Sequence, residues 1–280
     1  MCNRYALITG ASGGLGKFLA IECARKGMNL VLVSLPGNDL FHLRNYIIRT
    51  FNVDVFCIEI DLSEENNCYE LYSKVKDENI AVSVLINNAG IGGTFPFDEK
   101  EPGYYSKVIS LNVTTPTILC RLFLPDLKNN APSFIMNVSS LAGILNLPHK
   151  QVYGATKSYL LSFSKSLRKE LRTHNISVSV LCPGGMNTYW RLTMENRMMR
   201  TWISRQSVME PSHVAAIGIN KMIERKELII TGFWNRCFLF WNQLFPKTIK
   251  DGLMNYQMNK SKRKESIVPV LQPQLITVKK

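Results

Sequence analysis

YALITGASGGLG, residues 5–16, decides the fold. Its first five residues are mostly apolar and read as a buried strand, its glycines form a turn, and a helix is expected over about 16–26. Glycines let a backbone approach a pyrophosphate closely, and a helix N-terminus offers amide donors to that group. The stretch therefore predicts a strand–turn–helix unit suited to a dinucleotide.

Strands and helices alternate along the chain after this unit. We expect strands over 29–34, 53–60, 82–87, 133–139 and 177–182, and helices over 40–50 (with Asp39 as its cap), 64–78, 102–124 and 153–172. The strands are nearly continuously apolar, as in a parallel sheet covered on both faces. With right-handed crossovers, the pattern predicts an α/β fold: a single-domain Rossmann-type doubly wound parallel sheet with helices on both faces.

The length of 280 residues fits one large α/β domain. The hydrophobic fraction of 46% is ordinary for a soluble protein with a substantial core. The seven cysteines are scattered without a C-x-x-C pair, which favours a reducing compartment. The chain opens on a strand-like segment rather than a secretory signal, and no uncharged apolar run reaches the ~18–20 residues that span a bilayer. We expect a cytoplasmic protein with no metal site.

Positive charge is concentrated near the C-terminus. The chain has a net charge of +13, and nine Lys and Arg against two acidic residues lie from residue 233 onward. No nucleic-acid-binding module is recognisable, so we expect no nucleic-acid partner. A solvated tail is the simplest interpretation, and contact with a membrane surface or an anionic ligand is the alternative.

Tyr153 and Lys157 are a candidate acid/base pair. Four residues apart on a predicted helix, they lie on the same face, one turn from each other. A phenol has a pKa of about 10, and we expect the nearby ammonium to move that pKa toward the working range. An isolated Y-x-x-x-K is usually an ordinary surface pair, so the assignment depends on the other motifs.

Those motifs resemble the classical short-chain dehydrogenases/reductases. TGASGGLG at 9–16 is similar to the TGxxxGxG cofactor loop of that family, and the family's later motifs follow in order between about residues 5 and 230. They are Asp61-Leu62, Asn87-Asn88-Ala89-Gly90, Asn112, Ser139-Ser140, Tyr153-x-x-x-Lys157 and Pro183-Gly184. Ser140 lies thirteen residues before Tyr153, a spacing that favours it over Ser139 as the catalytic serine.

The resemblance implies a nicotinamide cofactor and an active site at the carboxyl ends of the strands. The predicted catalytic set is Asn112, Ser140, Tyr153 and Lys157. The predicted cofactor-binding set is Gly10, Ser12, Gly14, Leu15, Gly16, Ser34, Asp61, Leu62, Asn88, Ala89, Gly90, Tyr153, Lys157, Pro183, Gly184 and Thr188. Metal ligands are absent from the prediction.

Each predicted catalytic residue has a physical role. Tyr153 passes a proton to or from the substrate oxygen while hydride moves between substrate and nicotinamide, and Ser140 orients that oxygen. Lys157 tunes Tyr153 and bonds the nicotinamide ribose. The resemblance implies that Asn112 holds a water linking Lys157 to solvent, although hydrogen bonding at a helix bend would also explain this asparagine.

The rest of the motifs have expected places around the cofactor. Asn88 would stabilise the sheet centre and the cofactor's edge, Asp61 and Leu62 would meet the adenine, and Thr188 would lie near the nicotinamide carboxamide. Strand-end hydrogen bonding is the structural alternative for Asn88.

The end of the second strand favours NADP(H) over NAD(H). NAD sites usually place an acidic residue there to bond the ribose hydroxyls, whereas this chain has Ser34-Leu35-Pro36. Without the carboxylate, a 2′-phosphate meets no repulsion, and Ser12, Ser34 and Lys17 could contact it. Against this preference, the arginine that is common in NADP-preferring relatives is missing too.

Two regions beyond the motifs bear on the substrate and on partners. We assign 1–232 to the catalytic domain, including a substrate lid over 186–210 that is rich in Met, Trp and Arg, and 233–280 to an aromatic and basic extension. The lid's apolar residues suit a greasy ligand or simply pack the lid against the body, and its arginines suit an acidic head group. The extension would lie on a membrane through 233–264, cover the pocket, or pack in a dimer.

We therefore expect an NAD(P)(H)-dependent oxidoreductase that interconverts a ketone and a secondary alcohol on a hydrophobic, lipid-like substrate of the keto-acyl, long-chain base or steroid type. The alternatives are an epimerase of the same family and a non-catalytic dinucleotide-sensing regulator. The latter normally goes with loss of the tyrosine or the lysine, and both are present. Relatives are often oligomers, so a homo-oligomer is expected.

Overall fold

The computed structural model describes residues 4–37, 40–186 and 208–244, without the side chains of residues 238 and 242–244. Residues Met1–Arg236 form one compact unit and Cys237–Lys280 another. The first unit holds the sheet and all of the motifs. The expected division at residue 232 stays a prediction, and the helix that begins at Phe233 continues to Leu244.

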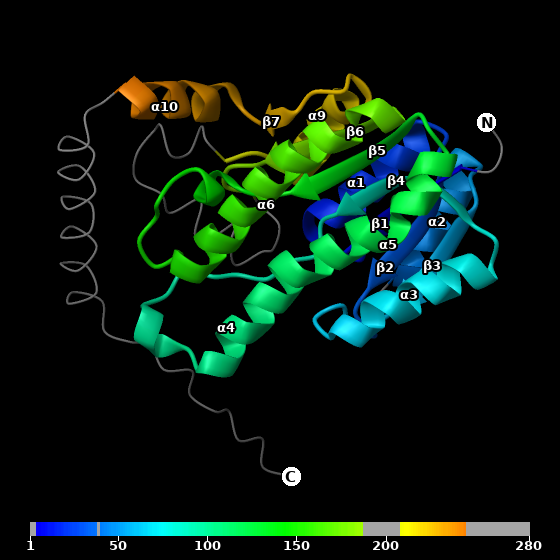
Figure 1. The fold of residues 1–280 in the computed structure, drawn as a ribbon, viewed down its shortest axis with the longest axis horizontal. Helices are drawn as coiled ribbons and strands as arrows, with labels where there is room; N and C mark the ends of the chain where they lie inside the picture. The colour runs from blue at the N-terminus through cyan, green and yellow to red at the C-terminus, as the bar shows by residue number, and fades with distance from the viewer. Residues whose placement is uncertain (1–3, 38–39, 187–207, 245–280) are drawn as a thin grey trace, which may run out of the picture. The chain divides into compact units, whose positions relative to one another are not determined.

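The sheet has seven parallel strands in the order β3-β2-β1-β4-β5-β6-β7 (Figure 1). They are β1 (Arg4–Thr9), β2 (Asn29–Ser34), β3 (Val55–Glu59), β4 (Ala81–Asn87), β5 (Ser133–Val138), β6 (Ile176–Cys182) and β7 (Leu228–Ile230). The predicted doubly wound parallel sheet is confirmed. Sequence reasoning missed β7, because a three-residue strand carries too short a pattern to detect.

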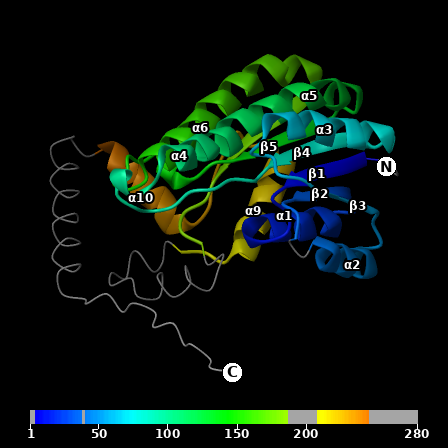
Figure 2. The same cartoon turned by 90° about the horizontal axis from the view of Figure 1, so that it is seen from below.

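The helices cover both faces of the sheet. They are α1 (Gly14–Arg25), α2 (Leu40–Phe51), α3 (Glu65–Asp77), α4 (Pro102–Ile109), α5 (Thr115–Asn129), α6 (Gln151–Leu171), α9 (Pro211–Ile223) and α10 (Phe233–Leu244). Figure 2 shows α1, α2 and α9 on one side of the sheet and α3, α5 and α6 on the other. A π-helical turn, Ser110–Thr114, joins α4 to α5. The helix predicted to open at Tyr153 begins two residues earlier.

Alternation along the strands divides the core into two layers. On β1, Ile8 packs with the cluster that includes Leu19 of α1 and Ile219 of α9. Its neighbour Leu7 packs with the opposite cluster, which includes Phe123 of α5. Successive side chains of a strand point to opposite faces, so a strand that is apolar at every position is buried on both. This burial on both faces holds the strand ends that border the site in place.

One continuous helical stretch is long and apolar enough to cross a membrane by length and composition: Pro102–Asn129, which comprises α4, the π turn and α5, with a mean hydropathy of 1.3. Of its most apolar window, 44% is buried within the protein. Phe123 in this stretch is fully buried in the core. Part of the apolar surface of this stretch is therefore buried in the core of the protein.

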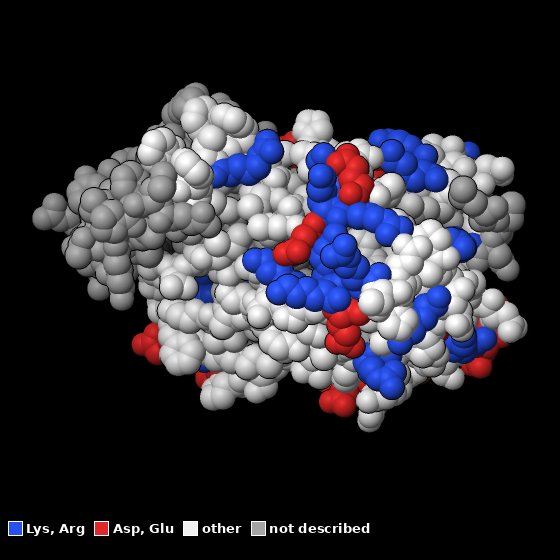
Figure 3. All heavy atoms as spheres, turned by 45° about the horizontal axis from the view of Figure 1, so that its top comes forward, with Lys and Arg blue, Asp and Glu red and all other residues white. Residues whose placement is uncertain are grey.

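Basic side chains on the surface are interspersed with acidic ones on the face that Figure 3 shows. Some of the arginines also hold the fold together. Arg168 of α6 donates to the carbonyl oxygens of Val178 (2.7 Å) and Arg225 (2.6 Å) and lies 3.8 Å from the Glu227 carboxylate. Part of the positive charge is thus used to tie α6 to β6 and to the loop before β7.

Candidate active site

The turn between β1 and α1 is built on glycines that the backbone requires. Gly10 and Gly14 have φ angles of +66° and +52°, a region that favours glycine. Gly16 lies against the turn itself, since a Cβ there would fall 1.9 Å from the Gly10 carbonyl oxygen. A Cβ on Gly13, in contrast, would have no atom within 4 Å. The turn is therefore closely packed at Gly16 and open at Gly13.

The N-terminus of α1 fits a bound pyrophosphate. Gly13 caps the helix with extended backbone and without a side-chain hydrogen bond, and the first turn has no acidic residue. Helix amides and the helix dipole favour an anion at such an end. Ser12 and Gly14 are partly exposed at this surface, whereas Leu15 and Gly16 are buried beneath it.

Asn88 joins the ends of β1 and β4. Its side-chain amide donates to the carbonyl oxygens of Thr9 (3.0 Å) and Gly10 (3.2 Å). The backbone amides of Asn88 and Ala89 both donate to the Thr9 hydroxyl at 3.0 Å. Asn88 thus has the structural role considered in the sequence, and its role at the cofactor's edge stays a prediction.

Asn112 lies on the π-helical turn, fully buried. Its Oδ1 accepts from the Ile91 amide (3.0 Å), and its Nδ2 donates to the Ile91 carbonyl (2.9 Å) and to the Thr156 hydroxyl (3.1 Å). A Cβ on Gly90 would fall 3.0 Å from Oδ1 of Asn112 and 3.3 Å from Nζ of Lys157. Glycine at position 90 therefore leaves both polar groups facing the same narrow space.

Lys157 is a buried ammonium. It is 4% exposed, its Nζ donates to the Val138 carbonyl oxygen at 2.8 Å, and it lies 5.8 Å from the centre of the Tyr153 ring. Burial lowers the pKa of Lys157 to about 8, because transfer of a charge from water to a protein interior is costly. The predicted one-turn proximity of the tyrosine and the lysine is present.

The environment of Tyr153 differs from our expectation in one respect. We expected the lysine to lower its pKa, but burial raises the pKa of Tyr153, and a hydrogen bond with the Ser140 hydroxyl only partly opposes this. Burial raises this pKa because a phenolate would lose its hydration there. The ring lies flat against Gly92, where a Cβ would be 2.2 Å from ring carbon Cδ2.

The two adjacent serines have different partners. The Ser139 hydroxyl is buried and donates to the backbone carbonyl of Lys157 at 2.7 Å. The Ser140 hydroxyl accepts from the Ala142 amide at 3.1 Å and meets Tyr153. Only Ser140 is therefore placed to share a substrate oxygen with the tyrosine, as the spacing in the sequence predicts.

Ser34, at the end of β2, is less accessible than expected. It is 4% exposed, and its hydroxyl donates to the carbonyl oxygen of the next residue, Leu35, at 3.1 Å. Leu35 itself is 48% exposed. Lys17 is exposed on the first turn of α1, so of the residues considered for a 2′-phosphate it is the cation at the surface.

Asp61 follows β3 with a carboxylate that the protein already binds. Its oxygens accept from the Ser63 amide (2.9 Å) and hydroxyl (2.7 Å) and from the Lys107 ammonium (3.2 Å). Burial pushes the pKa of Asp61 upward, but these donors outweigh it and leave that pKa below its usual value. Leu62 is buried beside it. Contact of the pair with adenine stays a prediction.

Pro183 and Gly184 follow β6. The Pro183 carbonyl accepts from the amide of Leu141, the residue after the candidate catalytic serine, at 2.9 Å. Gly184 is packed by Asn235, since a Cβ on Gly184 would fall 2.5 Å from the asparagine Nδ2. Thr188 and most of the expected lid lie outside the described residues.

Three residues that contact this site were not predicted. Thr156 holds Asn112, Gly92 seats the Tyr153 ring, and Asn235 packs on Gly184. The Gly92-Gly93 pair is a signal that sequence reasoning left unused. The position of Asn235 in an aromatic segment offers no such signal.

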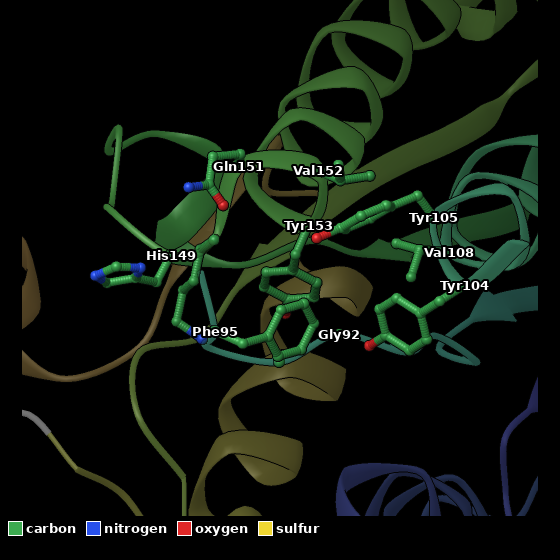
Figure 4. Close-up of a pocket in the computed structure, with 11 residues that line it drawn as sticks. Gly92, Phe95, Tyr104, Tyr105, Val108, His149, Gln151, Val152 and Tyr153 are labelled. Atoms are coloured by element: carbon green, nitrogen blue, oxygen red, sulfur yellow. The ribbon is translucent and has the colours of Figure 1, made fainter. Parts of the chain in front are cut away.

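A small pocket opens beside Tyr153, between α4, α6 and the loop after β4 (Figure 4). Its walls include Phe95 and Tyr104, whose rings meet edge to face at 5.4 Å. The Phe95 amide donates to the His149 carbonyl at 3.1 Å, which fastens one wall to the loop before α6. Lys150 at the rim lies with its Nζ 5.4 Å from the centre of the Tyr153 ring. The pocket is largely aromatic, with basic groups at its edge.

Comparison with known proteins agrees with this geometry. The chain is 32% identical to the very-long-chain 3-oxoacyl-CoA reductase of Mus musculus over 187 residues, 65% of this chain and 59% of that protein. It is 30% identical to the 17-beta-hydroxysteroid dehydrogenase type 3 of Mus musculus over 203 residues, 71% of this chain and 65% of that protein. The chain thus matches less than two thirds of the length of these relatives.

Among solved structures, the bulky-bulky ketone specific alcohol dehydrogenase from Comamonas testosteroni superposes with a TM-score of 0.72 at 26% identity, over 90% of this chain and 93% of that one. The sequence model described as short chain dehydrogenase matches residues 4–198, which include every predicted motif from the β1–α1 turn to Thr188. This chain therefore belongs to the short-chain dehydrogenase family.

Proposed function

We propose that the protein is an NADP(H)-preferring oxidoreductase that interconverts a ketone and a secondary alcohol on a hydrophobic, lipid-like molecule. One observation carries the proposal: a buried ammonium, Lys157, lies one helical turn from Tyr153, whose ring faces an aromatic pocket and whose hydroxyl meets Ser140. A buried cation beside a phenol is costly to maintain and suits acid/base chemistry.

In the direction of reduction, Tyr153 donates its phenolic proton to the substrate oxygen. Its raised pKa keeps that proton in place at neutral pH until negative charge develops on the oxygen. Ser140 donates a hydrogen bond to the same oxygen and fixes its position. Lys157 stabilises the phenolate that remains and then passes a proton back to it, and Asn112 borders the space through which Lys157 would regain that proton from solvent. The bound nicotinamide supplies the hydride.

The cofactor preference rests on the end of β2. No acidic residue stands at positions 34–37, and Lys17 offers a cation on the neighbouring turn of α1. NADPH should therefore bind more tightly than NADH. Because Ser34 is buried and Leu35 is exposed, Leu35→Asp should reverse that order through charge repulsion, and Lys17→Gln should weaken NADPH binding more than NADH binding. Equal dissociation constants for the two cofactors in the unmodified protein would contradict the preference.

The substrate class rests on the pocket walls and on the relatives. Phe95, Tyr104, Val108 and Val152 present apolar surface beside Tyr153, and the relatives are a 3-oxoacyl-CoA reductase and a hydroxysteroid dehydrogenase. We expect kcat/KM to rise with alkyl length in a graded series of ketones, assayed by cofactor consumption with both nicotinamides. Equal activity on short and long ketones would contradict a lipid-like substrate.

Two other functions give different results in the same assay. An epimerase of the family would convert its substrate with no net consumption of cofactor. A dinucleotide-sensing regulator would bind the cofactor and consume none with any ketone or alcohol. Tyr153 and Lys157 together favour the two enzymes over the regulator, and net consumption of cofactor distinguishes the oxidoreductase from the epimerase.

We infer that α10 gives the protein a peripheral contact with membranes. Phe233, Phe240 and Trp241 are 63%, 59% and 55% exposed, and positions i, i+7 and i+8 share one face of a helix. Large rings on a helix face favour the membrane interface, and each basic residue nearby adds about 1 kcal/mol at an anionic surface.

Vesicle co-sedimentation tests this contact. The unmodified chain should pellet with anionic vesicles at low salt and less at high salt, and a Phe240→Ser, Trp241→Ser variant should remain in the supernatant. Phe41→Ser is the matched control, because Phe41 on α2 is equally exposed at 57%. Equal binding by all three proteins would assign the contact to the basic residues alone.

A homo-oligomer is expected from the same family resemblance, and the open apolar groove along α4 and α6 is its candidate interface. Ile109, Val113, Val152 and Ala155 line this groove. Light scattering should give a mass of at least twice the 31.8 kDa of the chain, and Val113→Glu should reduce it. A monomeric mass at micromolar concentration would contradict the proposal.

A further inference from the structure

The turn that follows β6 is supported from behind by a residue that no family motif contains. Cys182 pairs with Ile230 in the sheet, so the chain leaves β6 and β7 side by side. Pro183-Gly184 follows the first strand, and Thr231-Gly232 follows the second. The residues that follow β7 therefore lie beside the turn that follows β6.

Asn235 occupies that position. It lies in the first turn of α10, is 3% exposed, and donates from Nδ2 to the Thr231 carbonyl oxygen at 2.8 Å. Its amide plane packs directly against Gly184: a Cβ there would meet Nδ2 at 2.5 Å, Cγ at 3.0 Å and Oδ1 at 3.1 Å. The size of the Asn235 amide therefore determines how closely Gly184 can approach the first turn of α10.

The surroundings make this contact firm. Gly232 has a φ of +86°, and a Cβ on it would lie 3.0 Å from both Asn235 Nδ2 and Met209 Sδ. The Met209 amide donates to the Gly185 carbonyl at 3.0 Å. Thr231 is fully buried, and its hydroxyl has no hydrogen-bond partner among the described residues. Its backbone carbonyl accepts from Asn235, and the neighbouring Gly232 carbonyl accepts from the Arg236 amide at 3.3 Å, so both bonds tie this corner to the first turn of α10.

The same turn reaches the candidate catalytic serine. Through its carbonyl oxygen, Pro183 accepts from the amide of Leu141, which directly follows Ser140. A shift of Gly184 would therefore move the surface that is expected to face the nicotinamide, and it would also move Ser140.

We propose that Asn235 is a positioning residue for the nicotinamide end of the cofactor site, acting through Gly184. The inference rests on the proposed function, because it takes Pro183-Gly184 as the turn that meets the nicotinamide. It also joins the first turn of α10 to the catalytic unit, so a chain shortened to Gly232 would lose this support.

Binding measurements separate positioning from general stability. Dissociation constants are measured for NADPH and for its adenosine half, 2′,5′-ADP, with the unmodified protein, Asn235→Leu and the control Asn130→Leu; NADH and ADP replace them if NADH binds more tightly. Asn130 also donates to the carbonyl four residues earlier, that of Asp126, at 2.8 Å, but at the amino ends of the strands. Leucine has a similar size and cannot donate.

Asn235→Leu should raise the dissociation constant of NADPH about tenfold, equivalent to about 1.4 kcal/mol, and leave that of 2′,5′-ADP within twofold. Asn130→Leu should change neither. Should Asn235→Leu fail to fold, Asn235→Ala is combined with Gly184→Ala, and the pair should bind NADPH more tightly than Gly184→Ala alone, because the smaller side chain makes room for the added Cβ.

Unchanged NADPH binding by Asn235→Leu, or equal weakening of NADPH and 2′,5′-ADP, would overturn the inference while leaving the proposed function intact. A double variant no better than Gly184→Ala alone would do the same. Failure of the unmodified protein to bind either dinucleotide would instead overturn the proposed function, and this inference with it.

Discussion

The two ends of the predicted cofactor site are built differently. At the end formed by β5, β6 and α6, the ammonium of Lys157 is 4% exposed and Asn112 is fully buried, each with protein hydrogen bonds. At the end formed by β2 and β3, Leu35 is 48% exposed, and Asp61 is bound by its neighbours Ser63 and Lys107. The end with Lys157 and Asn112, called the buried end below, lies inside the protein. The end with Leu35 and Asp61, called the rim, lies at its surface.

The difference teaches where chemistry constrains a fold. Groups that move protons must be held at fixed distances, and burial fixes them and shifts their pKa values. Groups that only recognise the adenosine half transfer no proton, so an exposed position such as Leu35 can border that half. We expect changes at the buried end to alter turnover and changes at the rim to alter cofactor choice.

A change between the two ends should disable both. In Gly16→Ala the new Cβ would overlap the Gly10 carbonyl oxygen, so the β1–α1 turn would have to move. We expect a loss of about 3 kcal/mol of unfolding free energy and no measurable dinucleotide binding. Urea unfolding and cofactor titration measure the two effects.

Gly13→Ala is the matched control, three residues away in the same turn. Its Cβ would meet no atom within 4 Å, and its backbone is extended, which alanine adopts freely. It should unfold within about 0.5 kcal/mol of the unmodified protein. If both alanines had the same effect, crowding behind the turn would not be the reason for Gly16.

Gly92→Ala should damage only the buried end. A Cβ at 92 would displace the Tyr153 ring, and a misplacement of about 1 Å can cost about 10²-fold in rate. We expect kcat to fall about 10- to 100-fold while the dissociation constant of the dinucleotide stays within twofold. Gly103→Ala on α4, which adds a Cβ to open space, should leave both quantities unchanged. Weakened cofactor binding in Gly92→Ala would contradict the claim that changes at the buried end act on turnover alone.

Burial of Lys157 should appear as a pH dependence of stability. Its folded pKa of about 8 lies below the unfolded value of about 10.4. Between these values the unfolded chain holds a proton that the folded chain has released, so stability rises with pH there. Relative to Lys157→Met, the unfolding free energy of the unmodified protein should increase by about 1.4 kcal/mol per pH unit between about pH 8 and 10. A flat difference would mean that the ammonium is not buried.

Much of the buried end follows from spacing in the sequence. The four-residue step from Tyr153 to Lys157 is a property of any helix, and the choice of Ser140 over Ser139 agrees with their hydrogen bonds. The parallel sheet followed from alternating apolar strands. These features are local or periodic, so the order of residues alone determines them.

Other features depend on contacts between distant segments. Asn235 meets Gly184 only because β6 and β7 pair, and β7 was too short to predict. The raised pKa of Tyr153 depends on how deeply α6 is buried, whereas the sequence showed only the nearby lysine. Ser34 ends the predicted strand, but the direction of its hydroxyl could not be known.

Single-turnover hydride transfer tests the central claim, that Tyr153 at the buried end passes the proton that accompanies reduction of a ketone. NADPH oxidation is followed after mixing with a long-chain ketone, for the unmodified protein and for Tyr153→Phe, with NADPH dissociation constants measured for both. We predict equal NADPH binding and a rate at least about 10²-fold lower in Tyr153→Phe. Equal rates in the two proteins would contradict the account.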